Sequence, residues 1–263
     1  MSGIIEKAKP AIEVSDLSAG YGGGYVIRNI SFKVNAGTSL CVLGPNGCGK
    51  STLLKSIAGL INYKGLVRLD GKDISGIPRK EFAKKIAIMG QTSQVLFSYT
   101  VHETVAMGRY AYSTGFLKSL SAEDNDIVES VIEKLGIIDI RDRLIDELSG
   151  GQLQRVFLAR TLAQTPDIIM LDEPTNHLDL KYQIELLEFL KSWVSENGKT
   201  LITVFHDLNL ARQFGDTALL ISGGNLVASG TVSQTMEDKI LHEVYGIDIS
   251  GFMRESLGKW LTG

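Results

Sequence analysis

The chain has 263 residues, of which 44% are apolar and 22% charged, which is ordinary for a globular protein of one or two closely packed domains. Its formal net charge of −3 creates no overall basic field, so the composition does not favour nucleic acid as a partner. Residues 1–10 are polar, which predicts no signal peptide. No apolar run approaches the roughly 20 residues of a membrane-spanning helix, so we expect any membrane contact to go through a partner protein.

The first third of the chain favours β-structure around one glycine-rich stretch. Alternating apolar residues predict strands, and apolar residues at helical spacing predict helices. The elements expected here, in chain order, are strands at 11–17 and 26–34 around a turn-rich stretch at 18–25, a strand at 38–43, a helix at 53–60, a strand at 66–69, a helix at 78–85 and a strand at 86–89.

Helical patterns then replace β patterns from about residue 92 to residue 163, and an alternation of strands and helices follows. We expect helices at 101–108, 122–135, 139–146 and 153–163, a strand at 167–171, a helix at 184–193, a strand at 200–205, a helix at 208–213, a hairpin of strands at 217–222 and 225–228, and a tail that is helical and then irregular. This order predicts an α/β fold with a helical insert.

The glycine-rich stretch lies between a predicted strand and a predicted helix, the setting that makes G-x-x-x-x-G-K-[ST] credible as a P-loop. Glycines let backbone N–H groups face a triphosphate, and the helix start adds its positive end. Lys50 can reach the β- and γ-phosphates, and the Ser51 hydroxyl can hold Mg²⁺. The residues assigned to triphosphate binding here are Gly44, Pro45, Asn46, Gly47, Cys48, Gly49, Lys50, Ser51 and Thr52.

The two cysteines are Cys41, in a predicted buried strand, and Cys48, inside the P-loop. A disulfide between them would distort the loop, so a reducing compartment fits the sequence better.

Two carboxylates follow the predicted strand at 167–171, where an open α/β sheet places its ligand crevice. Asp172 can reach Mg²⁺, directly or through water, whereas alone it could be a helix cap. Glu173 is then free to polarise the attacking water, whereas alone it could be a plain surface residue.

Three further side chains carry little weight one by one. Gln91 ends a predicted strand and could touch both the metal and the attacking water, although an isolated glutamine is more often solvated. His206 follows a predicted strand and could bond the γ-phosphate, or be an ordinary core histidine. Tyr21 could stack on a purine, with Tyr25 as a rival, or be a packed aromatic at a strand edge.

The stretch from Leu148 to Gln152, LSGGQ, adds a second phosphate site at a helix start, offered by Ser149, Gly150, Gly151 and Gln152. One chain has no evident need for two such sites on one triphosphate. A head-to-tail dimer does, because each subunit then offers this stretch to the nucleotide on the other's P-loop.

With these residues together, the sequence resembles the nucleotide-binding subunits of ATP-binding cassette (ABC) transporters over about residues 11–245. The matching positions are the Walker A residues 44–52, Gln91 of the Q-loop, the signature 148–152, the Walker B strand ending at Asp172, the catalytic base Glu173, the D-loop 176–179 with Asp179, the switch His206 and the A-loop aromatic Tyr21.

The resemblance implies a P-loop NTPase with a RecA-like core, an antiparallel β subdomain and a helical subdomain. We expect the ATP-binding core with its β subdomain over 1–91 and 164–263, and the helical subdomain with the signature over 92–163. It also implies ATP hydrolysis with Mg²⁺ by a homodimer that closes on two ATP molecules, and a groove after Gln91, floored by 95–97, that receives a membrane subunit.

Residues 99–124, 175–183 and 237–249 look like those of importers for siderophores, haem and vitamin B12. That branch implies uptake of an iron chelate or cobalamin, two permease subunits, an external substrate-binding protein, no nucleic acid, and a place on the cytoplasmic face of the cell membrane. An importer of another substrate (metal ion or oxyanion), a non-transport ABC ATPase, and a nucleotide-gated regulator with little turnover remain as alternatives. Past Ser250 the tail departs from the family, and we assign it no role.

Overall fold

A computed structural model of the chain describes residues 10–90, 98–113, 120–176 and 178–261. Its larger sheet has six strands in the order β10-β9-β3-β8-β7-β6. The strands from β9 to β6 are parallel to their neighbours, and only β10 runs antiparallel, against β9. These strands are β3 (Ser39–Leu43), β6 (Ile86–Met89), β7 (Ile168–Asp172), β8 (Thr200–Val204), β9 (Thr217–Ser222) and β10 (Asn225–Thr231).

Every residue of β3, β7 and β8 is buried, because helices and the second sheet cover both faces of these central strands. The second sheet is antiparallel, with the order β2-β1-β4-β5. It consists of β1 (Pro10–Tyr21), β2 (Gly24–Asn35), β4 (Tyr63–Leu69) and β5 (Lys72–Asp73). Helix α1 (Lys50–Ile57) contributes Leu53, Leu54 and Ile57 to one apolar core shared by both sheets.

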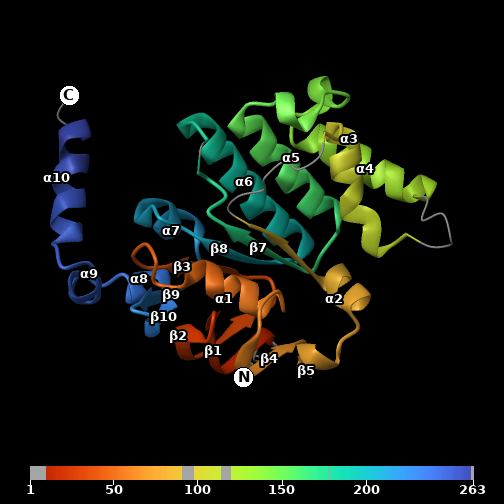
Figure 1. Cartoon of the computed structure of the whole chain (residues 1–263). Helices are drawn as coiled ribbons and strands as arrows, with labels where there is room; N and C mark the ends of the chain where they lie inside the picture. Colours follow the sequence, from red (N-terminus) through yellow and green to blue (C-terminus); the bar gives the residue numbers. More distant parts are fainter. Residues whose placement is uncertain (1–9, 91–97, 114–119, 177, 262–263) are drawn as a thin grey trace, which may run out of the picture.

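A group of helices lies on the side of the large sheet away from the antiparallel sheet (Figure 1). Its members are α3 (Val101–Ala106), α4 (Ala122–Lys134) and α5 (Gly150–Ala163), with short 3₁₀ turns at Met107–Ala111, Ile138–Ile140 and Ile145–Glu147. These helices have an apolar core of their own, which includes Val105, Ile132 and Val156.

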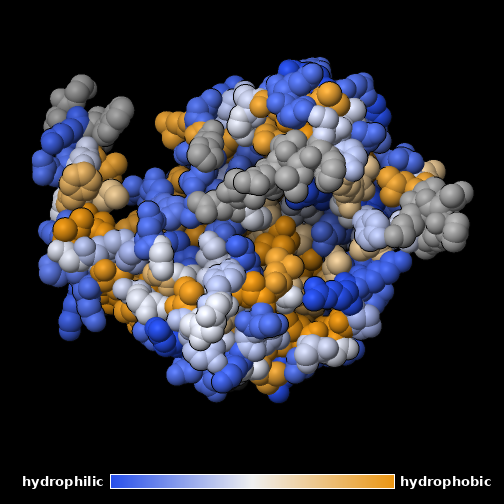
Figure 2. All heavy atoms as spheres, in the orientation of Figure 1, coloured by the Kyte–Doolittle hydropathy of each residue, from blue (hydrophilic) through white to orange (hydrophobic). Residues whose placement is uncertain are grey.

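The remaining helices are α2 (Arg79–Lys85), α6 (Leu180–Asn197), α7 (Leu208–Phe214), α8 (Val232–Thr235), α9 (Asp238–Tyr245) and α10 (Ile249–Leu261). Helix α10 extends along one edge of the molecule (Figure 1), where it leaves Phe252 and Leu257 about two-thirds exposed, at 65% and 59%. Hydrophobic surface is visible on this part of the chain in Figure 2. Within the described part of the chain, no helix combines the length and the apolarity needed to cross a bilayer.

The structure confirms most of the expected elements and corrects three of them. The stretch 18–25 is not mainly a turn, because β1 continues to Tyr21 and only Gly22 and Gly23 connect it to β2. The helix expected at 139–146 is wrong, since two 3₁₀ turns occupy this region. The tail from Ile249 to Leu261 is also not irregular: it forms α10.

Candidate functional site

The P-loop joins β3 to α1 at the carboxyl edge of the large sheet. Helix α1 begins after Gly49, which has a left-handed backbone (φ +108°) and supplies no side-chain cap. The first N–H groups of α1 are therefore left for a ligand rather than for a capping side chain. An anion such as a phosphate is what such a helix start attracts.

The loop glycines are required by space as well as by conformation. A Cβ on Gly44 would lie 2.0 Å from the carbonyl oxygen of Ile221, and one on Gly49 would lie 2.4 Å from a side-chain carbon of Ile27. Both glycines also have positive φ angles, of +141° and +108°. Strands β9 and β2 thus pack closely against one side of the loop, and the other side of the loop is open.

Lys50 is the first residue of α1 and is almost fully buried. Its Nζ donates to the loop's own carbonyl oxygens, at 2.8 Å from Gly44 O and 2.9 Å from Pro45 O. These bonds satisfy the ammonium group and shape the loop around it. Burial raises the pKa of the neighbouring Cys48 thiol, and the Lys50 charge only partly offsets this effect.

Asp172 ends β7 and is buried beside the P-loop. Burial raises the pKa of its carboxyl group, while a hydrogen bond from the Ser51 side chain opposes the rise. Oδ1 of Asp172 is buried without a hydrogen-bond partner. A buried carboxylate oxygen left unsatisfied beside a serine hydroxyl has the donor chemistry of a Mg²⁺ site, so these two residues fit the metal.

Glu173 follows directly, with a left-handed backbone (φ +56°) that is unusual for a residue other than glycine. Its carboxylate is divided between two partners. Oε1 pairs with Nε2 of His206, and Oε2 accepts a hydrogen bond from Nδ2 of Asn176. The structure therefore brings Glu173 and His206 together, and it adds Asn176, a residue of the D-loop stretch 176–179 whose bond to Glu173 the sequence did not predict.

A cavity of about 320 Å³ joins these parts of the chain. Its lining consists of Val26, Asn46, Gly47, Gly49, Lys50, Ser51, Thr52, Glu173 and His206. P-loop residues thus face Glu173, which follows β7, and His206, which follows β8, across one open space, an arrangement suited to holding a phosphate chain and attacking its end. No group of three or more His, Cys, Asp or Glu suited to a metal occurs among the described residues, so a metal here would need oxygens of the bound phosphates beside Ser51 and Asp172.

The signature residues do not line that cavity. Ser149 is the exposed N-cap of α5, and it forms a reciprocal capping box with Gln152. Gly150 and Gly151 open the helix beside it, and Gly151 lies close to Leu178. Asp179 caps α6 by accepting a hydrogen bond from the N–H of Tyr182 at 3.1 Å. Within one chain, then, the second phosphate site is not part of the P-loop cavity.

The two aromatic residues that could stack on a base, Tyr21 and Tyr25, have different surroundings. The Nζ of Lys64 lies 5.6 Å from the centre of the Tyr25 ring. Tyr21 is half-exposed at the end of β1. Its ring is thus the more available surface for a base. The predictions for Gln91 and the groove floor at 95–97 lie outside the described residues.

Comparison with known proteins places the chain in a family. The model of the ABC transporter family matches residues 27–176, a range that contains the P-loop, LSGGQ, Asp172 and Glu173. The chain therefore belongs to the ABC transporter family, and its nucleotide site is that of an ATP-hydrolysing cassette.

Individual relatives agree with this placement. The Iron(3+)-hydroxamate import ATP-binding protein FhuC of Bacillus subtilis is 37% identical over 239 residues, covering 90% of this chain and 88% of that protein. The uncharacterized ABC transporter ATP-binding protein YvrA of the same organism is 39% identical over 249 residues, or 94% of this chain, which spans only 56% of YvrA.

A solved structure supports the fold. A chain from an inward-facing metal-chelate type ABC transporter superposes with a TM-score of 0.79 at 26% identity. The match covers 91% of this chain and 90% of the other. The α/β P-loop fold predicted from sequence is thereby confirmed.

Proposed function

We propose that this chain is the ATP-hydrolysing subunit of an importer for an iron chelate (siderophore or haem) or for cobalamin. The main support for ATP hydrolysis is the cavity in which Lys50 and Ser51 face Glu173 and His206. The cargo class rests on FhuC, which is named for iron(3+)-hydroxamate import, and on the metal-chelate type transporter.

In this proposal the P-loop amides and Lys50 bind the phosphates of ATP, and Tyr21 stacks on the adenine. Ser51, Asp172 and Gln91 hold Mg²⁺, which neutralises charge on the phosphates when it is bound. Two observations support Ser51 and Asp172 as ligands: Oδ1 of Asp172 is buried without a partner, and the Ser51 side chain forms a hydrogen bond with the Asp172 carboxyl group.

Glu173 is the general base in the proposed reaction. Its carboxylate accepts a proton from the water that attacks the γ-phosphorus, the bond to the β–γ bridging oxygen breaks, and ADP and phosphate leave. His206 bonds the γ-phosphate and orients Glu173, and Gln91 helps to place the water. The pairing of His206 with Glu173 supports this division of roles.

Two copies form a head-to-tail dimer in the proposed working state. Ser149, Gly150, Gly151 and Gln152 of one copy contact the ATP on the P-loop of the other, and Asp179 lies at the same junction. The exposed position of Ser149, outside the P-loop cavity, supports a site completed by a second copy. The core over 1–91 and 164–263 and the helical subdomain over 92–163 would move relative to each other as the dimer closes.

Two permease subunits would hold this dimer at the cytoplasmic face of the cell membrane, and an external binding protein would deliver the cargo. The net charge of −3 gives no support for nucleic acid. An importer of another substrate uses the same nucleotide chemistry and stays the alternative.

Glu173→Gln tests the dimer and the catalytic base together. This variant should retain ATP binding and lose nearly all turnover. It should also shift from monomer to dimer when ATP is added without Mg²⁺, because hydrolysis no longer opens the closed dimer. Solution mass and phosphate release are the measurements. Normal turnover would remove Glu173 from the mechanism, and bound ATP without dimerisation would contradict assembly of the site by two copies of this chain alone.

The cargo needs a separate test. Cells lacking this chain should lose uptake of a ferric siderophore, haem or cobalamin, and the wild-type gene should restore it while the gene for Glu173→Gln should not. Unchanged uptake of all three would overturn the proposed cargo class but leave the ATPase assignment intact.

A further inference from the structure

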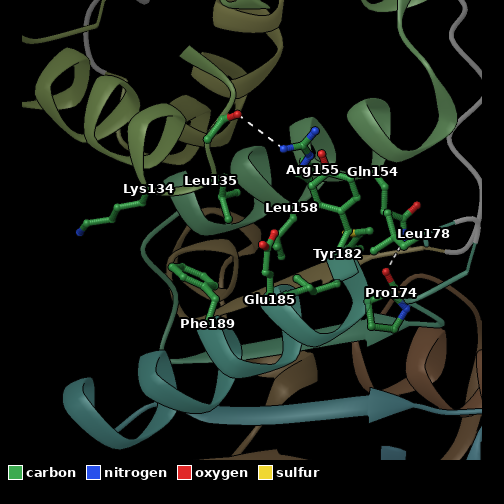
Figure 3. A pocket seen from close by; sticks show the side chains of 13 residues that line it. Lys134, Leu135, Gln154, Arg155, Leu158, Pro174, Leu178, Tyr182, Glu185 and Phe189 are labelled. Atoms are coloured by element: carbon green, nitrogen blue, oxygen red, sulfur yellow. Dashed lines mark hydrogen bonds between the residues drawn. The ribbon is translucent and has the colours of Figure 1, made fainter. Parts of the chain in front are cut away.

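The signature helix and the catalytic residue of the same chain are connected by one side chain. Gln154, in the second turn of α5, extends its amide to the loop that follows β7. Its Nε2 donates to the carbonyl oxygen of Pro174 at 2.8 Å (Figure 3). Pro174 is the residue immediately after Glu173, so the hydrogen bond acts one peptide away from the catalytic carboxylate.

The backbone at this point is sensitive to such a contact. Glu173 has a φ of +56°, a conformation that persists only where surrounding contacts impose it. Pro174 has a fixed φ and no N–H, so its carbonyl oxygen is the polar backbone atom by which a neighbour can hold it. A displacement of this oxygen is therefore passed to the backbone of Glu173.

The other end of the loop is attached to α6 rather than to α5. Nε2 of Gln183 donates to the carbonyl oxygens of Thr175 and Leu178, at 3.2 Å and 3.0 Å. The loop that carries Glu173 thus spans two helices, with Gln183 holding it to α6 and Gln154 holding it to α5. A shift of α5 relative to α6 would therefore act on the part of the loop next to Glu173 through the hydrogen bond of Gln154.

The structure leaves room for such a shift. A cavity of about 310 Å³ lies between α5, α6 and the end of α4, lined in part by Leu135, Leu158 and Phe189 (Figure 3). Gln154 and Pro174 are on its wall. Arg155, also on the wall, has its guanidinium 4.6 Å from the centre of the Tyr182 ring and a buried Nε without a partner. Close-packed interiors resist displacement, whereas a void of this size gives α5 freedom to move against α6.

We infer that Gln154 is a positioning residue for Glu173, which transmits a displacement of α5 to the catalytic carboxylate of the same chain. The inference rests on the proposed function, in which Ser149 to Gln152 at the start of α5 contact the ATP held by the other copy. Occupancy of one ATP site in the dimer is then sensed at the other, because α5 belongs to the first site and Glu173 to the second.

The test removes the hydrogen bond between Gln154 and Pro174 but keeps the volume of the side chain at position 154 nearly the same. Gln154→Met keeps a side chain of similar length and lacks the donor, whereas Gln154→Lys keeps a donor that can reach Pro174. Glu185→Gln is the matched control, because Glu185 lines the same cavity and has no part in the bond. The full-length chain is assayed for kcat, the KM for ATP and thermal unfolding, each against wild type.

Gln154→Met should lower kcat by about tenfold or more with KM for ATP unchanged, since a 1 Å misplacement of a catalytic group can cost on the order of 100-fold. Gln154→Lys should recover most of the loss, and Glu185→Gln should behave as wild type. An unchanged kcat for Gln154→Met, or a loss that Gln154→Lys does not repair, would overturn the inference.

One further variant separates this inference from the proposed function. Glu173→Gln combined with Gln154→Met should still dimerise on ATP, because Gln154 acts on the base and not on ATP binding. Failure of Glu173→Gln alone to dimerise would count against the proposed dimer. Dimerisation of Glu173→Gln that is lost only on adding Gln154→Met would show that Gln154 supports closure, and would contradict the positioning role.

Discussion

At the scale of single residues, the carboxylate of Glu173, the proposed general base, is the least predictable part of the site. Sequence placed Glu173 next to Asp172 and both at the end of a strand. It could not supply the left-handed backbone of Glu173 or the sharing of its two oxygens between His206 and Asn176. Those features depend on the loop after β7, which carries both Glu173 and Asn176, and on His206, which follows β8 and is 33 residues further along the chain, so no single local pattern encodes them.

The two cysteines give a prediction about chemical reactivity. Burial raises the pKa of Cys41 to about 12, with the Asp216 charge adding to the effect, and burial also raises the pKa of Cys48. Because the thiolate is the reactive form, iodoacetamide at pH 8 should label neither cysteine in the native chain and both after unfolding. Mass spectrometry of timed samples measures this. Rapid labelling of native Cys41 would contradict its burial.

The same shift has a consequence for stability. The folded pKa of Cys41 lies above that of an unfolded thiol near 8.5. The unfolded chain therefore releases this proton first as the pH rises, and the free energy of unfolding should fall between about pH 8.5 and 12. Cys41→Ser should show a weaker decline over this interval in urea titrations at increasing pH. An equal decline would assign the loss to other groups.

At the scale of elements, one buried ion pair ties the helical group together. Nε of Arg109 lies 2.8 Å from Oδ1 of Asp124, and Nη1 donates to the carbonyl oxygen of Ala163 at the end of α5. Asp124 also forms a capping box with Ser121 at the start of α4. A single guanidinium thus joins three elements, and its removal leaves a buried carboxylate unpaired.

Arg109→Ala should lower the free energy of unfolding by about 3–5 kcal/mol, as expected for breaking a buried pair from one side. Urea denaturation measures the change. Lys181→Ala, which removes an exposed pair with Glu185, is the control and should leave the urea midpoint unchanged. A loss no larger than that of the control would show that the Arg109 pair contributes little.

The pair also predicts a pH dependence. Burial tends to raise the pKa of Asp124, but hydrogen bonds from Ser121 and Arg109 outweigh it, so the pKa is lowered. The stabilisation is present above the unfolded pKa near 4 and is lost as the pH falls through the lower, folded pKa. Below pH 4, wild type should lose stability more steeply than Arg109→Ala. If stability fell equally with pH in wild type and in Arg109→Ala, the acid dependence would come from groups other than Asp124.

Close packing within the same group gives another test. A Cβ on Gly108 would lie 2.2 Å from the carbonyl oxygen of Arg160 and 3.0 Å from Cβ of Ala163. Gly108→Ala should therefore cost about 1–3 kcal/mol through overpacking. Gly76→Ala is the matched control, because a Cβ there meets nothing within 4 Å. Equal urea midpoints for the two variants would show that α5 can withdraw from Gly108 without cost.

Sequence predicted elements well where periodicity was strong and poorly where it was not. Strand β6 and the β9–β10 hairpin begin and end close to the expected residues, because continuous apolar runs and the Gly223–Gly224 turn are local signals. The region 139–146 alternates charged and apolar residues without a sustained helical face, and it forms only short turns. The sequence predicted an irregular end to the helical tail where α10 forms, and this helix keeps Phe252 and Leu257 exposed, so these apolar residues do not mark a buried helix face.

At the scale of the whole molecule, the separation of LSGGQ from the P-loop cavity is the feature that supports the proposed second copy. Ser149→Arg places a long cation on the exposed N-cap of α5. Because Ser149 lies outside the cavity, ATP should bind the free chain with unchanged affinity. In the Glu173→Gln background, however, ATP should no longer produce a dimer, since the guanidinium occupies the space of the second copy's nucleotide.

Loss of the helix cap must be distinguished from loss of the contact between copies. Thr231→Arg provides this control, because Thr231 caps α8 through the same box with a glutamine, Gln234, as Ser149 forms with Gln152. Both substitutions cost the helix about 1 kcal/mol, but only Ser149→Arg should abolish the ATP-dependent rise in solution mass. If Ser149→Arg still dimerised, the two copies would have to meet through another face, and LSGGQ would need a different role.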